Sequence, residues 1–198
     1  MTRIILASGS ASRAGLLTAA GVAFEVVSPH VDEETIKESM LAEKAPPRDV
    51  ADALAALKAS KVSVSHPGAL VIGSDLVLVF EGELISKAPD LNTARQLLKR
   101  LAGQKHALIG AVVIAKDGAI VWRHVERAEL TMRKFSDAFL EDYLARQGDD
   151  ILSSVGCYHL EGEGAQLFSL ISGDYFTILG LPLLPVLNAL RDLGALSQ

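Results

Sequence analysis

The chain has 198 residues, a formal net charge of −5 and a hydrophobic fraction of 49%. Charged residues make up 22% and are spread along the chain, which is typical of a globular protein long enough to bury a substantial core. The acidic balance and the lack of a long basic run exclude a surface for duplex nucleic acid, since such binding depends on clustered Lys and Arg. We expect one folding unit over residues 1–198.

Two stretches, 108–125 and 178–193, are apolar enough to raise the question of a membrane span. Both are interrupted by charged residues, and the second also contains prolines, so neither offers about 20 uninterrupted apolar residues. The first residues lack the long apolar segment of a secretory signal. Cys157 is the only cysteine, which excludes an internal disulfide. A protein that does not span a membrane and lies in the cytoplasm is therefore expected.

The spacing of apolar residues and of turn residues predicts the secondary structure in chain order. The first part contains a strand at 4–7, a helix at 13–20, a strand at 24–28, an acidic loop after Pro29, a helix capped by Asp49 and a strand at 70–74. The middle contains a hairpin at 77–86, a helix capped by Asn92, a hairpin at 107–125 around Asp117-Gly118 and a strand at 129–133. The last part contains a helix capped by Ser136 that stops at Gly148, a glycine-rich region at 156–164, a short element at 165–171 and a helix at about 182–193. Strands joined both by hairpins and by helices indicate an α/β fold with a mixed sheet and flanking helices.

Common motifs for phosphate binding and nucleophilic catalysis are absent. The chain has no G-x-x-x-x-G-K-[ST] loop, no G-x-G-x-x-G motif and no G-x-S-x-G elbow. Cys157 and His159 form a nucleophile and a base only if they meet in space, and a small buried cysteine is the simpler interpretation. P-loop and dinucleotide-binding hypotheses are therefore set aside.

Ser8 to Arg13 lies between a predicted strand and a predicted helix. At such a position, free backbone N–H groups and the positive end of the helix dipole favour an anion, and Arg13 would add a charged contact to phosphate oxygens. The alternative is a serine-rich capped turn beside a solvated arginine. Position in the sequence alone favours the capped turn over the phosphate site.

Carboxylates and lysines elsewhere in the chain are further candidates. Asp32 and Asp75 each follow a predicted strand, where α/β sheets bind ligands, and two carboxylates can hold Mg²⁺. Lys58 and Lys87 would supply positive charge for a polyanion. The alternatives are a solvated acidic loop, a capping aspartate and ordinary surface lysines.

Together these segments resemble the Maf family of nucleoside triphosphate pyrophosphatases. The matching segments occur in family order from end to end: Leu6 to Arg13, Val31 to Glu33, Lys58-Ala59, Val71 to Asp75, Ser86-Lys87, Glu161 to Ala165, Gly173 to Tyr175 and Gly180 to Leu183. The resemblance implies a mixed-sheet α/β fold with a deep cleft, often as a homodimer. It also implies hydrolysis of a nucleoside triphosphate to the monophosphate and pyrophosphate with Mg²⁺ or Mn²⁺.

The resemblance further implies roles for single residues. Asp75 looks like the catalytic carboxylate that activates water or holds the metal, and Asp32 looks like its partner in metal binding. The residues that look like phosphate binders are Ser8, Arg13, Lys58 and Lys87. An alternative function is that of a nucleotide-binding regulator without significant turnover, because members of this family have been linked to septum formation and cell-division arrest.

Three positions bear on the choice of base. Members that act on pyrimidine triphosphates tend to have arginine, threonine and glutamine where this chain has Ser12, Leu76 and Glu161. Glu161 is similar to members that act on 7-methylguanosine triphosphate, but Ser12 and Leu76 are not, so the base stays open. Ala88 and Ser153 also depart from the family pattern.

Overall fold

The computed structural model describes residues 2–197, which pack into two compact units. Unit 1 takes in the chain up to Leu76, residues 109–126 and the chain from Tyr175 onward. Unit 2 takes in residues 77–108 and 127–174. Each unit is thus assembled from segments that are distant in the sequence.

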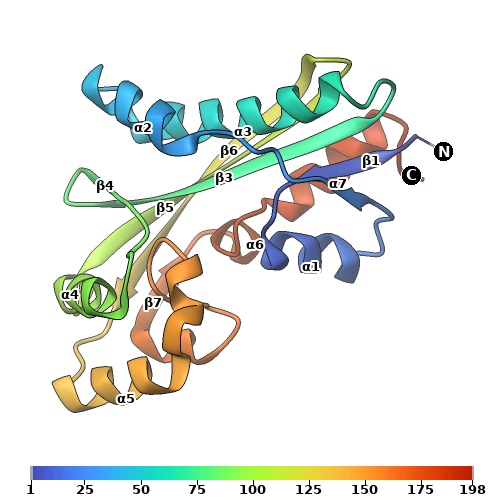
Figure 1. Cartoon of the computed structure of the whole chain (residues 1–198). Coiled ribbons are helices and arrows are strands. Elements are labelled where there is room, and N and C mark those ends of the chain that lie inside the picture. Colours follow the sequence, from blue (N-terminus) through green and yellow to red (C-terminus); the bar gives the residue numbers. More distant parts are fainter. Residues whose placement is uncertain (1, 198) are drawn as a thin grey trace. The chain divides into compact units, whose positions relative to one another are not determined.

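The strands of residues 2–197 form one mixed seven-stranded sheet with the order β2-β1-β3-β5-β6-β7, and β4 pairs with β3 (Figure 1). Their bounds are β1 (Ile4–Ala7), β2 (Glu25–Val26), β3 (Leu70–Phe80), β4 (Glu83–Ile85), β5 (Lys105–Lys116), β6 (Ala119–Met132) and β7 (Phe168–Ser172). β1 is parallel to β2 and to β3, whereas β4 is antiparallel to β3 and β7 to β6. The expected α/β fold with a mixed sheet is confirmed.

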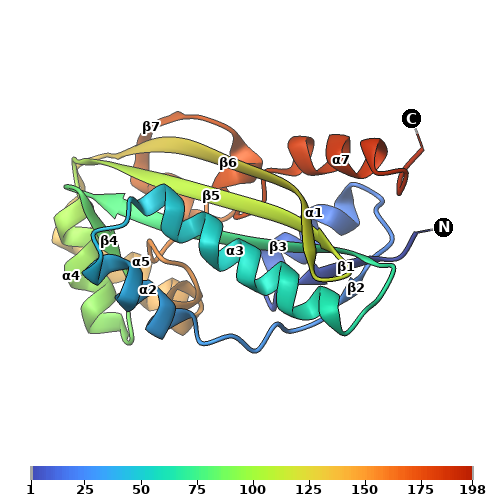
Figure 2. The same cartoon turned by 90° about the horizontal axis from the view of Figure 1, so that it is seen from above.

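Helices flank this sheet. Their bounds are α1 (Ala11–Ala19), α2 (Glu33–Ala42), α3 (Pro47–Val64), α4 (Leu91–Leu101), α5 (Asp137–Gln147), α6 (Tyr175–Ile178) and α7 (Leu183–Asp192), with 3-10 helices η1 (Gly148–Ser153) and η2 (Glu163–Leu167). Within unit 1, Figures 1 and 2 show α3 on one side of β1 and β3, and α1 and α7 on the other. Among residues 2–197, no helix has both the length and the apolar character needed to cross a membrane.

Alternation along the strands of unit 1 explains its two hydrophobic layers. Successive side chains of a strand point to opposite faces of the sheet. One layer contains Ile72 of β3 and packs against α1 and α7, while the other contains Val71 and packs against Val62 of α3. By the same alternation, Ser74 points to the α1 and α7 side and Asp75 points to the α3 side.

Gly73 allows α3 to lie directly on β3. A Cβ atom at this position would overlap the carbonyl oxygen of Ala55 and would lie 2.6 Å from the backbone nitrogen of Ala59. Both atoms belong to the backbone of α3, so any other residue at position 73 would force the helix away from the strand. This close approach brings the side chains of α3 to the level of Asp75.

Some predicted boundaries and caps were wrong. The acidic segment after Pro29 is not a loop but contains α2, whose N-cap is Asp32 and whose first turn carries Glu33 and Glu34, where negative charge is favourable. Asp49 lies in the first turn of α3 and does not cap it. Likewise, Asp90 rather than Asn92 caps α4, because the Asp90 carboxylate accepts the N–H of the third helical residue.

β3 and β6 are longer than predicted. The two strands expected before and after position 75 are one strand, β3, so Asp75 lies within a strand and does not follow its end. β6 similarly continues through the strand expected at 129–133. The hairpin turn at Asp117-Gly118 is confirmed, and both of its residues have the positive φ that this kind of turn requires.

The core of unit 2 contains a buried polar pair among aromatic rings. His106 is 3% exposed, and its Nε2 lies 2.8 Å from the hydroxyl of Tyr158. The ring of Tyr158 packs edge-on against Phe168. Burial lowers the pKa of His106 to about 4, so the imidazole is neutral at neutral pH.

Candidate functional site

Ser8 links the end of β1 to the start of α1. Its Oγ accepts a hydrogen bond from the backbone N–H of Ser10 at 3.2 Å and one from Nη1 of Arg13 at 3.1 Å. Ser10 is the N-cap of α1, since its Oγ accepts the N–H of Arg13. A Cβ atom at Gly9 would meet no atom within 4 Å, so space is open beside the loop. The strand and the loop expected around these residues are confirmed, but the helix begins at Ala11, two residues before the predicted start at Arg13.

Arg13 turns its guanidinium inward from the first turn of α1. Its Nε donates to the carbonyl oxygen of Gly180 at 2.9 Å. Burial lowers the pKa of Arg13, while the charges of Asp75 and Glu33 act in the opposite direction. Because an arginine in a protein is always protonated, the group remains a cation with negative charge nearby.

Lys58 forms the centre of an ion cluster between α2, α3 and β3. Its Nζ lies 2.7 Å from Oδ1 of Asp75 and 2.8 Å from Oε2 of Glu33. Lys58 is 4% exposed and Asp75 is 7% exposed. Buried charges are stable only when they are paired and hydrogen-bonded, so each of these two groups holds the other in place.

Glu33, and not Asp32, brings the second carboxylate to Lys58. Asp32 is exposed, and its carboxylate accepts hydrogen bonds from the backbone N–H and the hydroxyl of Thr35, which lower its pKa. The sequence contains a signal for this arrangement, because an aspartate before an amphipathic segment is a typical N-cap. Once a helix begins after Asp32, Glu33 is the first residue that it positions.

The register of the parallel strands explains why these groups meet. Ala7, the last residue of β1, pairs with Gly73 of β3. β3 therefore continues beyond its neighbour, and Ser74 and Asp75 lie at the level of the loop that follows β1. Of the site residues predicted from the sequence, unit 1 contains Ser8, Ser12, Arg13, Asp32, Lys58, Asp75 and Leu76.

Lys87 and Glu161 belong to unit 2, and their place in the site stays a prediction. Lys87 is exposed in the segment after β4. Glu161 is exposed in the turn between η1 and η2. Nearby, Cys157 is buried, and burial raises its pKa to about 11, which keeps the thiol protonated and agrees with the structural role expected for it.

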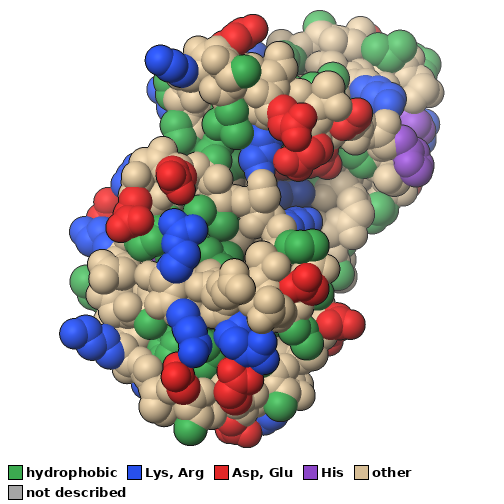
Figure 3. Space-filling view, turned by 60° about the vertical axis from the view of Figure 1, so that its left-hand side comes forward, with side chains coloured by type: hydrophobic (Ala, Val, Ile, Leu, Met, Phe, Trp, Pro, Cys, Tyr) green, Lys and Arg blue, Asp and Glu red, His purple; other side chains and the backbone are tan. Residues whose placement is uncertain are grey.

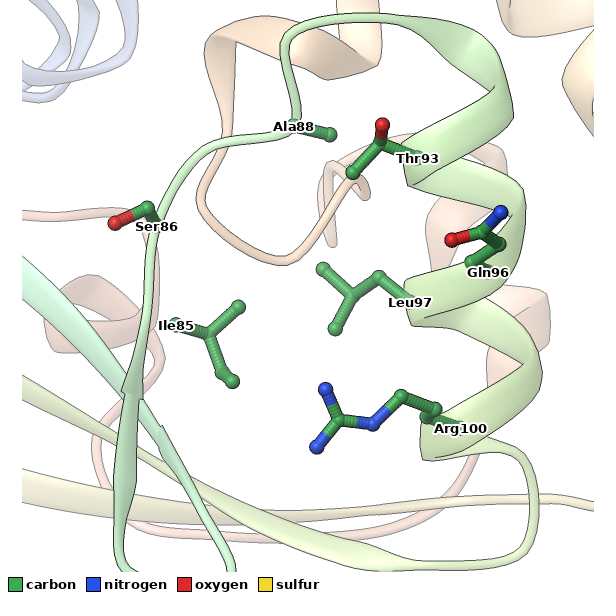
Figure 4. A pocket seen from close by; sticks show the side chains of 7 residues that line it. All are labelled: Ile85, Ser86, Ala88, Thr93, Gln96, Leu97 and Arg100. Carbon is green, nitrogen blue, oxygen red and sulfur yellow. The ribbon is translucent and has the colours of Figure 1, made fainter.

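Unit 2 also contains a cavity of about 160 Å³ between the end of β4, the segment that follows it, and α4. Figure 4 shows the seven side chains that line it, which are Ile85, Ser86, Ala88, Thr93, Gln96, Leu97 and Arg100. Arg100 is the one charged residue among them. Its guanidinium lies over the ring of Phe80 and within 4 Å of the carboxylates of Glu81 and Glu83. The cation at this cavity is therefore already engaged in contacts within unit 2.

Charge is mixed on one face of the molecule. On the face drawn in Figure 3, basic and acidic side chains lie interspersed with apolar ones. Within residues 2–197, no group of three or more His, Cys, Asp and Glu side chains converges as a metal site. The distinctive feature is thus the charge cluster of unit 1, in which Lys58 and Asp75 are buried and Glu33 is about half exposed. Together with Arg13, these residues supply two positive and two negative charges.

Comparisons with known proteins agree with this architecture. Residues 3–193 match the family described as Maf-like protein. A nucleoside triphosphate pyrophosphatase of Caulobacter vibrioides is 55% identical over 197 residues, covering 100% of this chain and 98% of the relative. Proteins with the same name in Ruegeria pomeroyi and Granulibacter bethesdensis are 53% and 50% identical, with at least 97% of each chain covered. The chain therefore belongs to the Maf-like protein family.

Proposed function

We propose that this protein hydrolyses a nucleoside triphosphate to the nucleoside monophosphate and pyrophosphate. The observation that carries the proposal is the placement of Lys58 between Asp75 and Glu33, with the guanidinium of Arg13 nearby. An acidic protein that binds a polyanion must gather its positive groups locally, and unit 1 does so. The relatives named above support the choice of reaction.

The geometry suits transfer of a phosphoryl-type group to water. Such reactions depend mainly on positioning and on neutralising the charge that develops on the phosphate oxygens. Lys58 would provide that neutralisation, Arg13 would bind the phosphate chain, and the N-terminus of α1 would add backbone N–H groups. Asp75 would accept a proton from the attacking water as its oxygen bonds to phosphorus and the bridging oxygen leaves with pyrophosphate.

The donor set fits a divalent cation. Oδ1 of Asp75 accepts a hydrogen bond from Nζ of Lys58, and the hydrogen bonds among residues 2–197 leave Oδ2 for another partner. Glu33, about half exposed, offers a second carboxylate. Mg²⁺ needs only one or two carboxylates, since it keeps several waters. When bound, it would polarise a phosphate oxygen and lower the pKa of a coordinated water; Mn²⁺ is the alternative ion.

Other parts of the proposal come from the sequence. Ser8 would join Arg13 at the phosphates, and Lys87 would add a further positive charge. The following features remain predictions: a cleft, a homodimer, a single functional domain and a cytoplasmic location. Selection of the base by Ser12, Leu76 and Glu161 is also a prediction. The resemblance assigned Asp32 to the metal, whereas its contacts with Thr35 favour Glu33 in that role.

The experiment is a panel of common and modified nucleoside triphosphates with Mg²⁺ or Mn²⁺, scored separately for pyrophosphate and orthophosphate. Asp75→Asn should lower pyrophosphate release by about 100-fold or more, because general-base contributions are of that size. Asp52→Asn is the matched control. Asp52 lies on α3 and pairs with Arg123 at 2.6 Å, so this variant also neutralises an ion-paired aspartate of unit 1.

Each outcome separates one class of function from the others. Absence of pyrophosphate from every nucleotide, with a folded protein, would refute the proposal. Tight nucleotide binding without product would support the regulatory alternative. Release of orthophosphate alone would indicate a general phosphate-ester hydrolase.

A further inference from the structure

Ser74 is a fully buried hydroxyl that the catalytic proposal does not use. It precedes Asp75 on β3 and points to the opposite face of the sheet. Its Oγ lies 2.8 Å from the carbonyl oxygen of Ala111 and 2.9 Å from that of Gly180. Because a serine hydroxyl has a single proton, the two carbonyls share one donor, which holds both segments against β3.

The carbonyl of Gly180 connects Ser74 to Arg13. It accepts from Ser74 Oγ and from Arg13 Nε, both at 2.9 Å, so both of its lone pairs are used. Gly180 has a φ of +100°, which other residues rarely adopt. A Cβ atom there would lie 3.3 Å from Arg13 Nε, the end of a flexible side chain that would have to move. The glycine therefore allows the carbonyl and the guanidinium to meet.

We infer that Ser74 and Gly180 are positioning residues for Arg13, which they orient toward the phosphate chain of the substrate. The inference rests on the proposed role of Arg13 as a phosphate binder. The Gly180 carbonyl accepts a hydrogen bond from Nε, and Oγ of Ser8 accepts one from Nη1 at 3.1 Å. With two nitrogens held, the plane of the guanidinium is set before substrate arrives, and Nη2 makes no hydrogen bond to residues 2–197. Pre-organisation of this kind strengthens binding because less rotamer freedom is lost on complex formation.

Proton exchange at Arg13 Nε tests the positioning without substrate. The ¹H–¹⁵N signal of this group is assigned as the one that Arg13→Lys removes. Ser74→Ala should accelerate the exchange of this proton with solvent by about tenfold. The reason is that the Gly180 carbonyl, which accepts from Arg13 Nε, would lose its hydrogen bond from Ser74. Ser63→Ala is the matched control, since Ser63 is equally buried, makes two hydrogen bonds and lies at the C-terminal end of α3. An exchange rate in Ser74→Ala equal to that in Ser63→Ala would overturn the inference.

Steady-state kinetics test the consequence for the reaction. Ser74→Ala should raise KM for the triphosphate by about five- to tenfold with little change in kcat, since loss of one hydrogen bond weakens substrate binding. Ser74→Thr keeps the hydroxyl and should restore KM. A purely structural role would instead reduce the fraction of folded enzyme, lowering apparent kcat and the melting temperature with KM unchanged, and that result would refute the inference.

A second variant, Gly180→Ala, disturbs Arg13 from the segment between α6 and α7 and leaves β3 unchanged. Gly180→Ala should raise KM more than Ser74→Ala does, because its methyl group displaces the guanidinium directly. Gly82→Ala is the control for backbone strain, with a φ of +85° and no atom within 4 Å of the added group. An equal KM in these two glycine variants would count against the inference. If the wild-type protein released no pyrophosphate, the proposed function would fail, while the exchange measurement would still decide the positioning.

Discussion

Replacement of Gly73 by alanine should damage both the fold and the site through one contact. The added methyl group would overlap the Ala55 carbonyl oxygen and lie 2.6 Å from the Ala59 nitrogen, whereas Cβ atoms in proteins essentially never approach other atoms closer than 3.0 Å. The obstacle is helix backbone, which cannot rotate aside. α3 must therefore retreat from β3 by roughly 1 Å, and overpacking of this kind costs about 1–3 kcal/mol of unfolding free energy.

The same displacement acts on the ion cluster. Lys58 lies on α3 one residue before Ala59, and its Nζ is 2.7 Å from Asp75. A retreat of roughly 1 Å would stretch this pair beyond hydrogen-bonding distance unless the side chain re-extends. Misplacement on that scale at an active site can cost up to about 100-fold in rate. We expect Gly73→Ala to lower kcat/KM by between about tenfold and 100-fold.

Urea unfolding and pyrophosphate release measure the two effects. Gly15→Ala adds the same methyl group to α1 where no atom lies within 4 Å, and should be neutral or stabilising by about 0.5–1 kcal/mol. Gly73→Ala should instead lower the melting temperature by roughly 3–10 °C. If Gly73→Ala matched the wild type in both assays, the argument that this glycine sets the distance between α3 and β3 would be wrong.

Two further predictions concern single side chains. Glu33→Gln should lower pyrophosphate release by about tenfold or more, while Asp32→Asn, which keeps an equally good helix cap, should change it little; the opposite order would return the metal role to Asp32. The buried His106 has a folded pKa of about 4, below its usual 6.5, so its contribution is complete above pH 6.5 and is lost as pH falls toward 4. Between pH 7.5 and 5 the wild type should lose about 2 kcal/mol of unfolding free energy, and the loss should shrink in His106→Phe when urea unfolding is compared at these two pH values. Equal pH dependence in both proteins would contradict the assignment.

The sequence could predict the elements whose signals are local. β1, the turn at Asp117-Gly118 and the helix capped by Ser136 each depend on a short apolar run or on turn and cap residues within a few positions. α2 escaped prediction because its residues are mostly polar and none of them is buried, so no apolar stripe marked it. The capping role of Asp32 was the one local signal for this helix.

The site was only partly predictable, since its contacts join segments distant in the sequence. Motif order singled out Arg13, Lys58 and Asp75, and the structure brings their charges together in unit 1. Burial of Lys58 had no local signal, because it depends on how closely α3 packs against Gly73 of another element. Glu33 was overlooked for a related reason: its contact with Lys58 required the start of α2 to be known.

Two adjacent residues of β3 connect the site to both layers of unit 1. Asp75 faces α3 and pairs with Lys58. Ser74 faces the opposite layer and donates to the Gly180 carbonyl, which also accepts a hydrogen bond from Arg13. One strand thus carries the Asp75 carboxylate on one face and, on the other face, the Ser74 hydroxyl that positions Arg13. The backbone of β3 sets the distance between these two side chains. Because α3 and the segment around Gly180 pack on different faces, a change in either layer should disturb one member of the charge cluster and leave the other in place. The expected separation is a loss in kcat through Asp75 for Gly73→Ala, and a rise in KM with little change in kcat through Arg13 for Ser74→Ala.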